Sequence, residues 1–165
     1  MSEIKIDDHE FQRRMHSLIE ALGDAHFHRV VGDIGQNLVE RTKRNIERGR
    51  DWQNRKFAEN RPVTLARKRG SKPLIDTGSF VANRIFYHVT GRSLILGAGG
   101  VQAATLHYGA KKGQFGRTRR GAPIPWGDIP ARPYMPVTDD GTNLVPAARE
   151  EVLTSITEYL EQASD

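Results

Sequence analysis

Helical spacing of apolar residues occurs at the two ends of this chain and is missing between them. Apolar side chains recur every three or four residues from Phe11 to Leu22, from Phe27 to Leu38 and again from Val145 to Leu160. Gly23 stands where the first of these helices should stop, and Gly49 follows the second. We therefore expect two N-terminal helices and one amphipathic C-terminal helix, with the rest of the fold held between them.

The middle of the chain carries one hairpin pattern. Arg84 to Thr90 and Ser93 to Gly97 are predicted strands, and Gly91 supplies the turn that joins them. A short helical segment, Val101 to Tyr108, follows and ends at a glycine. The sequence thus predicts one α+β domain over residues 1–165, with N-terminal helices and a C-terminal helix packed on a small antiparallel β-sheet.

Two long segments show no periodicity and are rich in basic residues. We predict long basic loops or arms at residues 49–72 and 110–121, with a short helix as an option around Thr64 to Lys68. A loop of more than about 15 residues in a compact domain is usually functional or becomes ordered on binding. The prolines from Pro123 to Pro136 then predict an extended stretch at a sheet edge or between subunits.

Charge is segregated along the chain. The net charge is only +5, yet residues 41–72 hold 12 basic and 3 acidic residues, a net of +9, and residues 111–120 add five basic residues. The ends are acidic, with a net of −4 over residues 1–40 and −6 over residues 138–165. Such a pattern suits binding to a polyanion, or contact between the basic patch of one copy and the acidic patch of another; a merely solvated surface is the third interpretation.

Catalytic and cofactor chemistry finds little support in the sequence. The chain has no cysteine, which excludes disulfides, thiol nucleophiles and cysteine-bound metals. His26 and His28 are two residues apart and point to different helix faces, and His107 lacks a partnered nucleophile. No stretch approaches the roughly 20 apolar residues of a membrane span, and the N-terminus has no secretory pattern. We expect no enzyme activity, no cofactor, no metal and no membrane contact.

Three motifs follow one another between Trp52 and Met135. They are Pro62-Val63-Thr64-Leu65-Ala66-Arg67-Lys68 with Pro73-Leu74-Ile75-Asp76-Thr77-Gly78-Ser79-Phe80, then Ala104-Thr105-Leu106-His107-Tyr108-Gly109, and then Ile129-Pro130-Ala131-Arg132-Pro133-Tyr134-Met135. In this order they resemble motifs of the virion-morphogenesis and tail-completion proteins of tailed bacteriophages. The chain departs from the family pattern at Phe80, where leucine is usual, and in a His107 to Gly109 spacing that is one residue shorter.

The resemblance implies a structural protein of the phage neck, a tail-completion or head–tail joining subunit that forms a ring, with six copies expected. Its partners would be copies of itself, the head-tail connector, and tail tube or tail terminator proteins. It would reside in the virion after assembly in the host cytoplasm. Independently of the family, the prolines around Arg132 fix an extended backbone that presents its planar guanidinium to a carboxylate, which suits a subunit joint. The predicted interface residues are Thr77, Gly78, His107, Tyr108, Arg132, Pro133 and Tyr134.

The basic residues are predicted to contact a neighbouring protein or, without sequence specificity, DNA in the lumen of the ring. They are Arg41, Arg44, Arg48, Arg67, Lys68, Lys111, Lys112, Arg117, Arg119 and Arg120. The alternative is a free, non-enzymatic nucleic-acid-binding protein, with arginines on phosphates and Trp52, Phe57 or Phe115 stacked on bases. An enzyme ranks third, since it would need a carboxylate pair that only folding could assemble.

Overall fold

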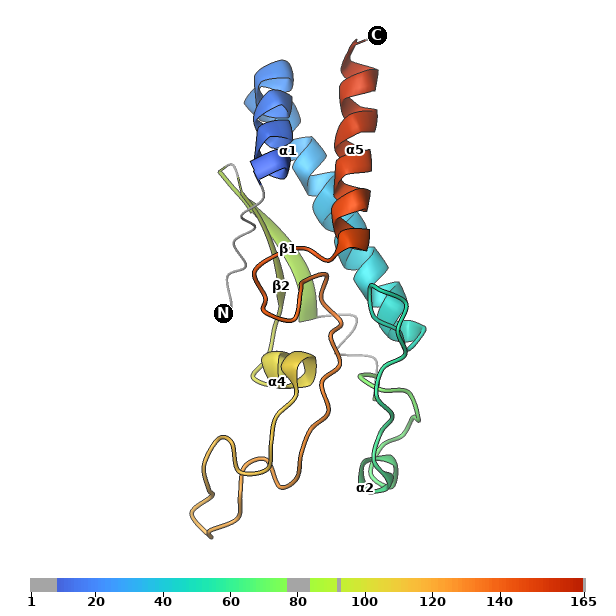
Figure 1. The fold of residues 1–165 in the computed structure, drawn as a ribbon, viewed down its shortest axis with the longest axis vertical. Coiled ribbons are helices and arrows are strands. Elements are labelled where there is room, and N and C mark those ends of the chain that lie inside the picture. The colour runs from blue at the N-terminus through green and yellow to red at the C-terminus, as the bar shows by residue number, and fades with distance from the viewer. Residues whose placement is uncertain (1–8, 77–83, 92, 165) are drawn as a thin grey trace.

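The computed structural model describes residues 9–76, 84–91 and 93–164. In chain order its elements are α1 (His9–Glu47), α2 (Pro62–Leu65), β1 (Ile85–Thr90), β2 (Ser93–Ala98), α4 (Ala103–Tyr108) and α5 (Pro146–Ser164). The predicted α+β class is confirmed. Figure 1 shows α5 and the start of α1 at one end of the long axis, and α2 and the loop after α4 at the other end.

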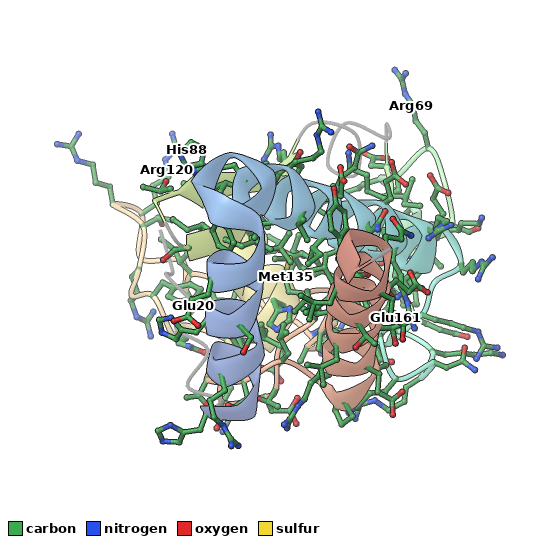
Figure 2. All side chains as sticks on the ribbon, turned by 90° about the horizontal axis from the view of Figure 1, so that it is seen from above. Glu20, Arg69, His88, Arg120, Met135 and Glu161 are labelled. Atoms are coloured by element: carbon green, nitrogen blue, oxygen red, sulfur yellow. The ribbon has the colours of Figure 1, made fainter. Side chains whose placement is uncertain are left out.

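The predicted helix end at Gly23 is wrong, because α1 continues through this residue from His9 to Glu47. Glycine inside a helix costs about 1 kcal/mol relative to alanine, and it ends a helix only where the backbone turns left-handed. Figure 2 shows instead that the blue ribbon of α1 changes direction along its length. The expected end before Gly49 is confirmed, since Gly49 has a φ of 69°.

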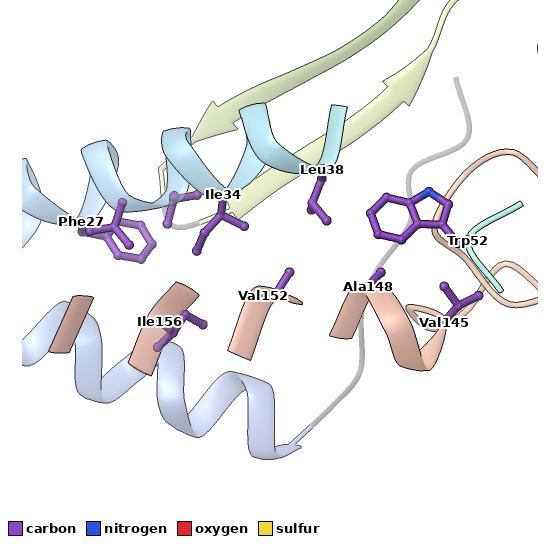
Figure 3. Packing of buried hydrophobic residues seen from close by; sticks show 10 residues of the cluster. Phe27, Ile34, Leu38, Trp52, Val145, Ala148, Val152 and Ile156 are labelled. Carbon is purple, nitrogen blue, oxygen red and sulfur yellow. The ribbon is translucent and has the colours of Figure 1, made fainter. Parts of the chain in front are cut away.

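The main core lies between α1 and α5. One face of α1 presents apolar side chains at helical spacing, and these side chains pack against a row of apolar side chains on α5 (Figure 3). Burial of these stripes is the driving force that holds the two helices together. The buried members are Phe27, Val30, Val31, Ile34, Leu38, Trp52, Val145, Ala148, Val152 and Ile156.

The hairpin also packs on α1. β1 and β2 pair antiparallel with Tyr87 opposite Leu96, and the predicted strands are confirmed. Burial along β1 alternates, so that Ile85 is buried while Phe86 is exposed. The helix approaches the sheet closely at Gly35, where an added Cβ atom would lie 2.5 Å from Tyr87 Cδ2 and 2.8 Å from Leu94 Cδ1. Gly35 is therefore the point at which helix and sheet meet.

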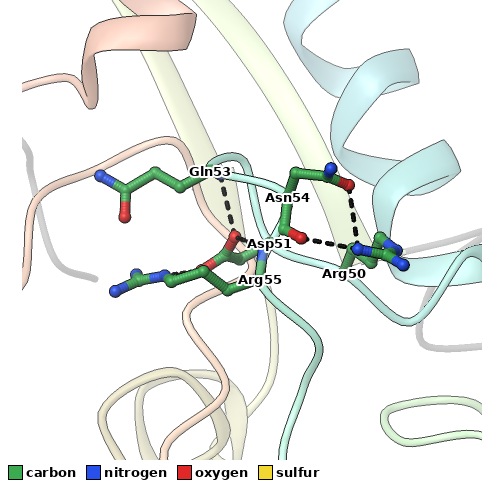
Figure 4. Close-up of polar contacts among 5 residues, drawn as sticks. All are labelled: Arg50, Asp51, Gln53, Asn54 and Arg55. Carbon is green, nitrogen blue, oxygen red and sulfur yellow. Dashed lines mark hydrogen bonds and ion pairs between the residues drawn. The ribbon is translucent and has the colours of Figure 1, made fainter.

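Residues 49–57, at the start of the first predicted loop or arm, fold back into the protein. The Asp51 carboxylate accepts hydrogen bonds from the backbone N–H groups of Gln53 (2.9 Å) and Arg55 (2.8 Å), and Arg55 Nε lies 2.6 Å from it (Figure 4). This turn carries Trp52 and Phe57 into the protein, where they are 3% and 6% exposed. Burial of two aromatic side chains outweighs the cost of ordering a short basic segment.

The contact at Gly35 can be tested with a pair of glycine substitutions in the same helix. We expect Gly35→Ala to lower the free energy of unfolding by about 1–2 kcal/mol, because the new methyl group must displace the Tyr87 ring. Gly32→Ala is the matched control, since nothing lies within 4 Å of its Cβ position. It should stabilise the protein by up to about 1 kcal/mol through helix propensity. Urea unfolding measures the free energy of unfolding of both variants. Equal changes in Gly35→Ala and Gly32→Ala would contradict the close contact of Gly35 with the hairpin.

Candidate assembly surfaces

The motif residues around α4 are brought together, but mostly inside the protein. His107, Arg132 and Tyr134 are 4%, 6% and 1% exposed. The imidazole of His107 meets the Tyr134 ring edge-on at 5.3 Å between centroids, and the Tyr134 hydroxyl donates to the Ala103 carbonyl oxygen at 3.1 Å. Burial raises the pKa of Tyr134, with Tyr108 adding to the effect, so the hydroxyl remains a donor. These side chains join α4 to residues 131–137.

Arg132 donates to its own chain. Its Nε lies 2.8 Å from the Ala58 carbonyl oxygen, and its Nη2 lies 3.0 Å from the Glu59 carbonyl oxygen and 3.4 Å from Asn60 Oδ1. Burial lowers the pKa of Arg132. The predicted outward presentation of this guanidinium to a carboxylate of a neighbour is therefore corrected. The extended backbone aims the fork inward, where it ties residues 58–60 to the rest of the fold.

His107 is held as a neutral imidazole. Its Nδ1 accepts a hydrogen bond from the Met135 backbone N–H at 3.4 Å, whereas its buried Nε2 has no partner within the described part of the chain. Burial lowers the pKa of His107 to about 4, although Asp139 acts in the opposite direction. A histidine of this kind contributes packing and one acceptor at neutral pH.

The remaining interface candidates differ in their placement. Tyr108 is half-exposed and packs edge-on against His107 at 4.5 Å between ring centroids, and Pro133 is half-buried. Gly109 has a φ of 76°, and a Cβ atom there would lie 2.7 Å from the Ile129 carbonyl oxygen. Thr77 and Gly78 lie outside the described residues.

Arg41 is half-buried and engaged within the chain. Its Nη1 pairs with the Glu151 carboxylate of α5, and its guanidinium carbon lies 4.7 Å from the centre of the Trp52 ring. The Trp52 indole N–H donates to Thr42 Oγ1 at 3.1 Å. The predicted stacking of Trp52 and Phe57 on bases is wrong as well, because both rings are buried.

Other basic candidates remain at the surface. Arg44, Arg48 and Arg67 are exposed. Lys68 is half-buried, and its Nζ donates to the Lys72 carbonyl oxygen at 2.9 Å. Burial lowers the pKa of Lys68, an effect that Asp76 opposes and Arg132 reinforces. The loop over residues 49–72 comes close to the segment that follows the second basic loop, since a Cβ atom at Gly127 would lie 3.3 Å from Arg61 Nη1.

Residues 110–129 form a single projection, which we call the basic arm. Its legs are joined by backbone hydrogen bonds from Ala110 N–H to Ile129 O (2.9 Å), Ile129 N–H to Ala110 O (2.7 Å) and Phe115 N–H to Ile124 O (2.8 Å). The sequence predicts a loop over residues 110–121 and an extended proline-rich stretch after it; in the structure, backbone hydrogen bonds pair the two segments. Glycines at residues 113 and 116 precede Arg119 and Arg120, and Gly121, Pro123 and Pro125 follow them; this composition is the sequence signal for such a turn.

The basic arm exposes charge and apolar surface together. It carries five basic residues and one acidic residue, a net of +4. Trp126 and Phe115 are 73% and 53% exposed, and Ile124 is exposed as well. Large side chains exposed together on one small projection are typical of a binding surface. The basic members are Lys111, Lys112, Arg117, Arg119 and Arg120, all exposed.

A second charged surface lies on α5. Glu150, Glu158 and Glu161 are exposed and fall on the helix face opposite the buried stripe, together with Thr154 and Thr157. We call these five residues the acidic stripe. None of the three glutamates makes an ion pair with another residue that the structure describes. Figures 1 and 2 place α5 and the basic arm far apart, with Arg120 and Glu161 on opposite sides of the molecule.

Two searches of the described residues gave no further site. Within residues 9–76, 84–91 and 93–164, no His, Asp and Glu side chains gather in a group able to hold a metal ion. Among the helices described there, none combines the length and the apolar character needed to cross a membrane.

The inward role of Arg132 predicts a loss of stability on substitution. We expect Arg132→Ala to lower the free energy of unfolding by about 2–3 kcal/mol, because the Ala58 and Glu59 carbonyl groups lose their donor. The free energy of unfolding of Arg132→Lys should lie between those of the wild type and Arg132→Ala, since an ammonium group cannot make the paired hydrogen bonds of a planar guanidinium. Arg69→Ala, at an exposed side chain (Figure 2), should stay within about 0.5 kcal/mol of the wild type. An Arg132→Ala chain that keeps full stability would return this residue to a role between subunits.

The buried His107 predicts a loss of stability at mildly acidic pH. Because its pKa falls from 6.5 to about 4 in the folded state, the unfolded chain binds an extra proton between these values. The free energy of unfolding should therefore fall by about 2–3 kcal/mol between pH 7 and pH 4.5 through this residue. His107→Phe should flatten that part of the profile, whereas His88→Gln, at an exposed site, should not. Denaturant unfolding at pH 7 and pH 4.5 measures this change. An equal change in the free energy of unfolding in the wild type, His107→Phe and His88→Gln would contradict the prediction.

Comparison with known proteins was made at the level of families, curated proteins and solved structures. The model of the phage virion morphogenesis family matches residues 6–161. Comparisons with curated proteins and with solved structures found no match. A match over nearly the full length agrees with the three motifs, which lie inward of both ends. The chain belongs to the phage virion morphogenesis family, and its role is in assembly of the phage particle.

Proposed function

We propose that this chain is a tail-completion subunit that forms a closed ring at the head-proximal end of the tail and joins the tail to the head. The observation that carries the proposal is the placement of the basic arm and the acidic stripe at opposite ends of the molecule (Figure 1). Two different patches that meet between copies make a heterologous interface, which yields a ring when the rotation closes. The ring number of six comes from the resemblance.

The polar residues of the motifs support a structural role. His107, Arg132 and Tyr134 are each engaged in packing or in hydrogen bonds to the backbone, and their pKa shifts have burial as their main cause. In the virion, the neighbours of the ring would be the head-tail connector on one side and tail tube or tail terminator proteins on the other. The ring would assemble in the host cytoplasm and remain in the neck.

A second candidate is non-enzymatic nucleic-acid binding through the basic arm. It is favoured by Phe115, which is 53% exposed between Lys112 and Arg117 and is free to stack on a base. Arg44 and Arg48 remain exposed for phosphate contact, whereas Arg41, Trp52 and Phe57 no longer contribute. Binding of this kind should weaken by about a hundredfold or more between about 50 mM and about 200 mM salt.

The two candidates are separated by adding the purified chain to phage tails that lack it. We expect rings or caps on the head-proximal end of the tails in negative-stain images, and recovery of joined, infectious particles when heads are added. Tails that already carry the chain are the control and should bind no more of it. Binding at the distal end or nowhere on the tail, with salt-sensitive binding of short DNA by the isolated chain, would favour the second candidate.

A further inference from the structure

We infer that the basic arm docks on the acidic stripe of α5 in a second copy of this chain. The inference rests on the proposed function, since a repeated contact of this kind would be the joint from which the ring is built. It names both sides of the contact, which the family assignment does not.

The arm is held together by hydrogen bonds within its own residues. Its legs are joined by the pairs Ala110–Ile129 and Arg117–Pro123, and its tip is closed by hydrogen bonds from Arg117 Nη1 to Gly121 O (2.8 Å) and from Thr118 N–H to Ala122 O (2.8 Å). At its base the Lys112 backbone N–H donates to Asp128 Oδ1 at 2.8 Å. A segment that is ordered internally before it binds loses little conformational entropy on docking.

The large apolar side chains of the arm are exposed to solvent in the isolated chain. Trp126 is 73% exposed and Phe115 is 53% exposed, whereas most large apolar residues at the core are below 10%. Large exposed aromatic side chains on a segment that also carries exposed arginine and lysine have the composition of an interface centre with a charged rim. The arm therefore presents both an apolar anchor and a guiding charge.

Charge complementarity identifies the partner as another copy. The arm has a net charge of +4, and the described residues 138–164 hold six acidic residues and one basic residue, a net of −5. Within that stretch the acidic stripe is the exposed part of α5, and half-buried Leu153 borders it. The arm cannot reach the stripe of its own chain, because Arg120 and Glu161 lie on opposite sides of the molecule (Figure 2). A contact between the basic arm and the acidic stripe therefore joins two different molecules.

The absence of cysteine makes a direct test available. One preparation carries Arg120→Cys and a second, distinguishable by mass, carries Glu161→Cys; the two are mixed and mildly oxidised at low salt. We expect the mixed disulfide to exceed its random share by several-fold, and the excess to disappear at about 1 M salt, where charge attraction is screened. A mixture of Arg69→Cys with Glu161→Cys is the matched control and should give random proportions. Random proportions with Arg120→Cys would overturn the inference.

Charge reversal tests the same contact in assembly. We expect Arg119→Glu with Arg120→Glu, and separately Glu158→Lys with Glu161→Lys, each to reduce attachment to tails at least tenfold. The chain that carries all four changes should regain attachment, because the reversed patches again attract each other. Arg13→Glu with Arg29→Glu changes the net charge of the chain as much as the arm reversal does, at exposed positions of α1, and should have little effect.

The outcomes separate this inference from the proposed function. Rings on tails that persist with either patch reversed would overturn the arm contact and leave the proposed function intact. A wild-type chain that never binds tails would overturn the proposed function, while the crosslinking result would still decide whether arm and stripe meet. Random crosslinking together with loss of DNA binding on arm reversal would assign the arm to nucleic acid and overturn the inference.

Discussion

The structure depends on α1, whose apolar residues enter both buried hydrophobic clusters. Phe27 to Leu38 pack against α5, Gly35 admits the hairpin, and Val39 and Ile46 reach the second cluster with Phe57 and Met135. With only 37% hydrophobic residues, the chain gains stability by letting one long helix serve two layers at once. The ion pair of Arg41 with Glu151 joins α1 to α5 at the edge of this packing.

The part of the protein beyond the hairpin is held by polar contacts as well as by apolar burial. Arg132 links residues 58–60 to the proline-rich stretch, and Tyr134 and His107 link that stretch to α4. Each of these side chains satisfies backbone groups in segments that have little regular secondary structure. The motifs shared with phage morphogenesis proteins thus stabilise the base from which the arm projects.

The protein has a packed body and an exposed basic arm, and this division suits a subunit of an assembly. The arm exposes its basic and aromatic side chains, and backbone hydrogen bonds join its two legs. In the proposed ring, the residues that stabilise the body are therefore different from those of the arm.

The sequence by itself determined the helix at the C-terminus, the hairpin over residues 84–97, the short helix before Gly109 and the family, because these depend on local periodicity, turn chemistry and short motifs. It also located the arm's charges. Only the tertiary structure decided that α1 passes through Gly23, that Trp52 and Phe57 are buried, and that Arg41 and Arg132 are engaged within the chain. The reason is physical: whether an aromatic ring or a guanidinium faces solvent depends on which distant segment folds against it, and no local pattern in the chain records that.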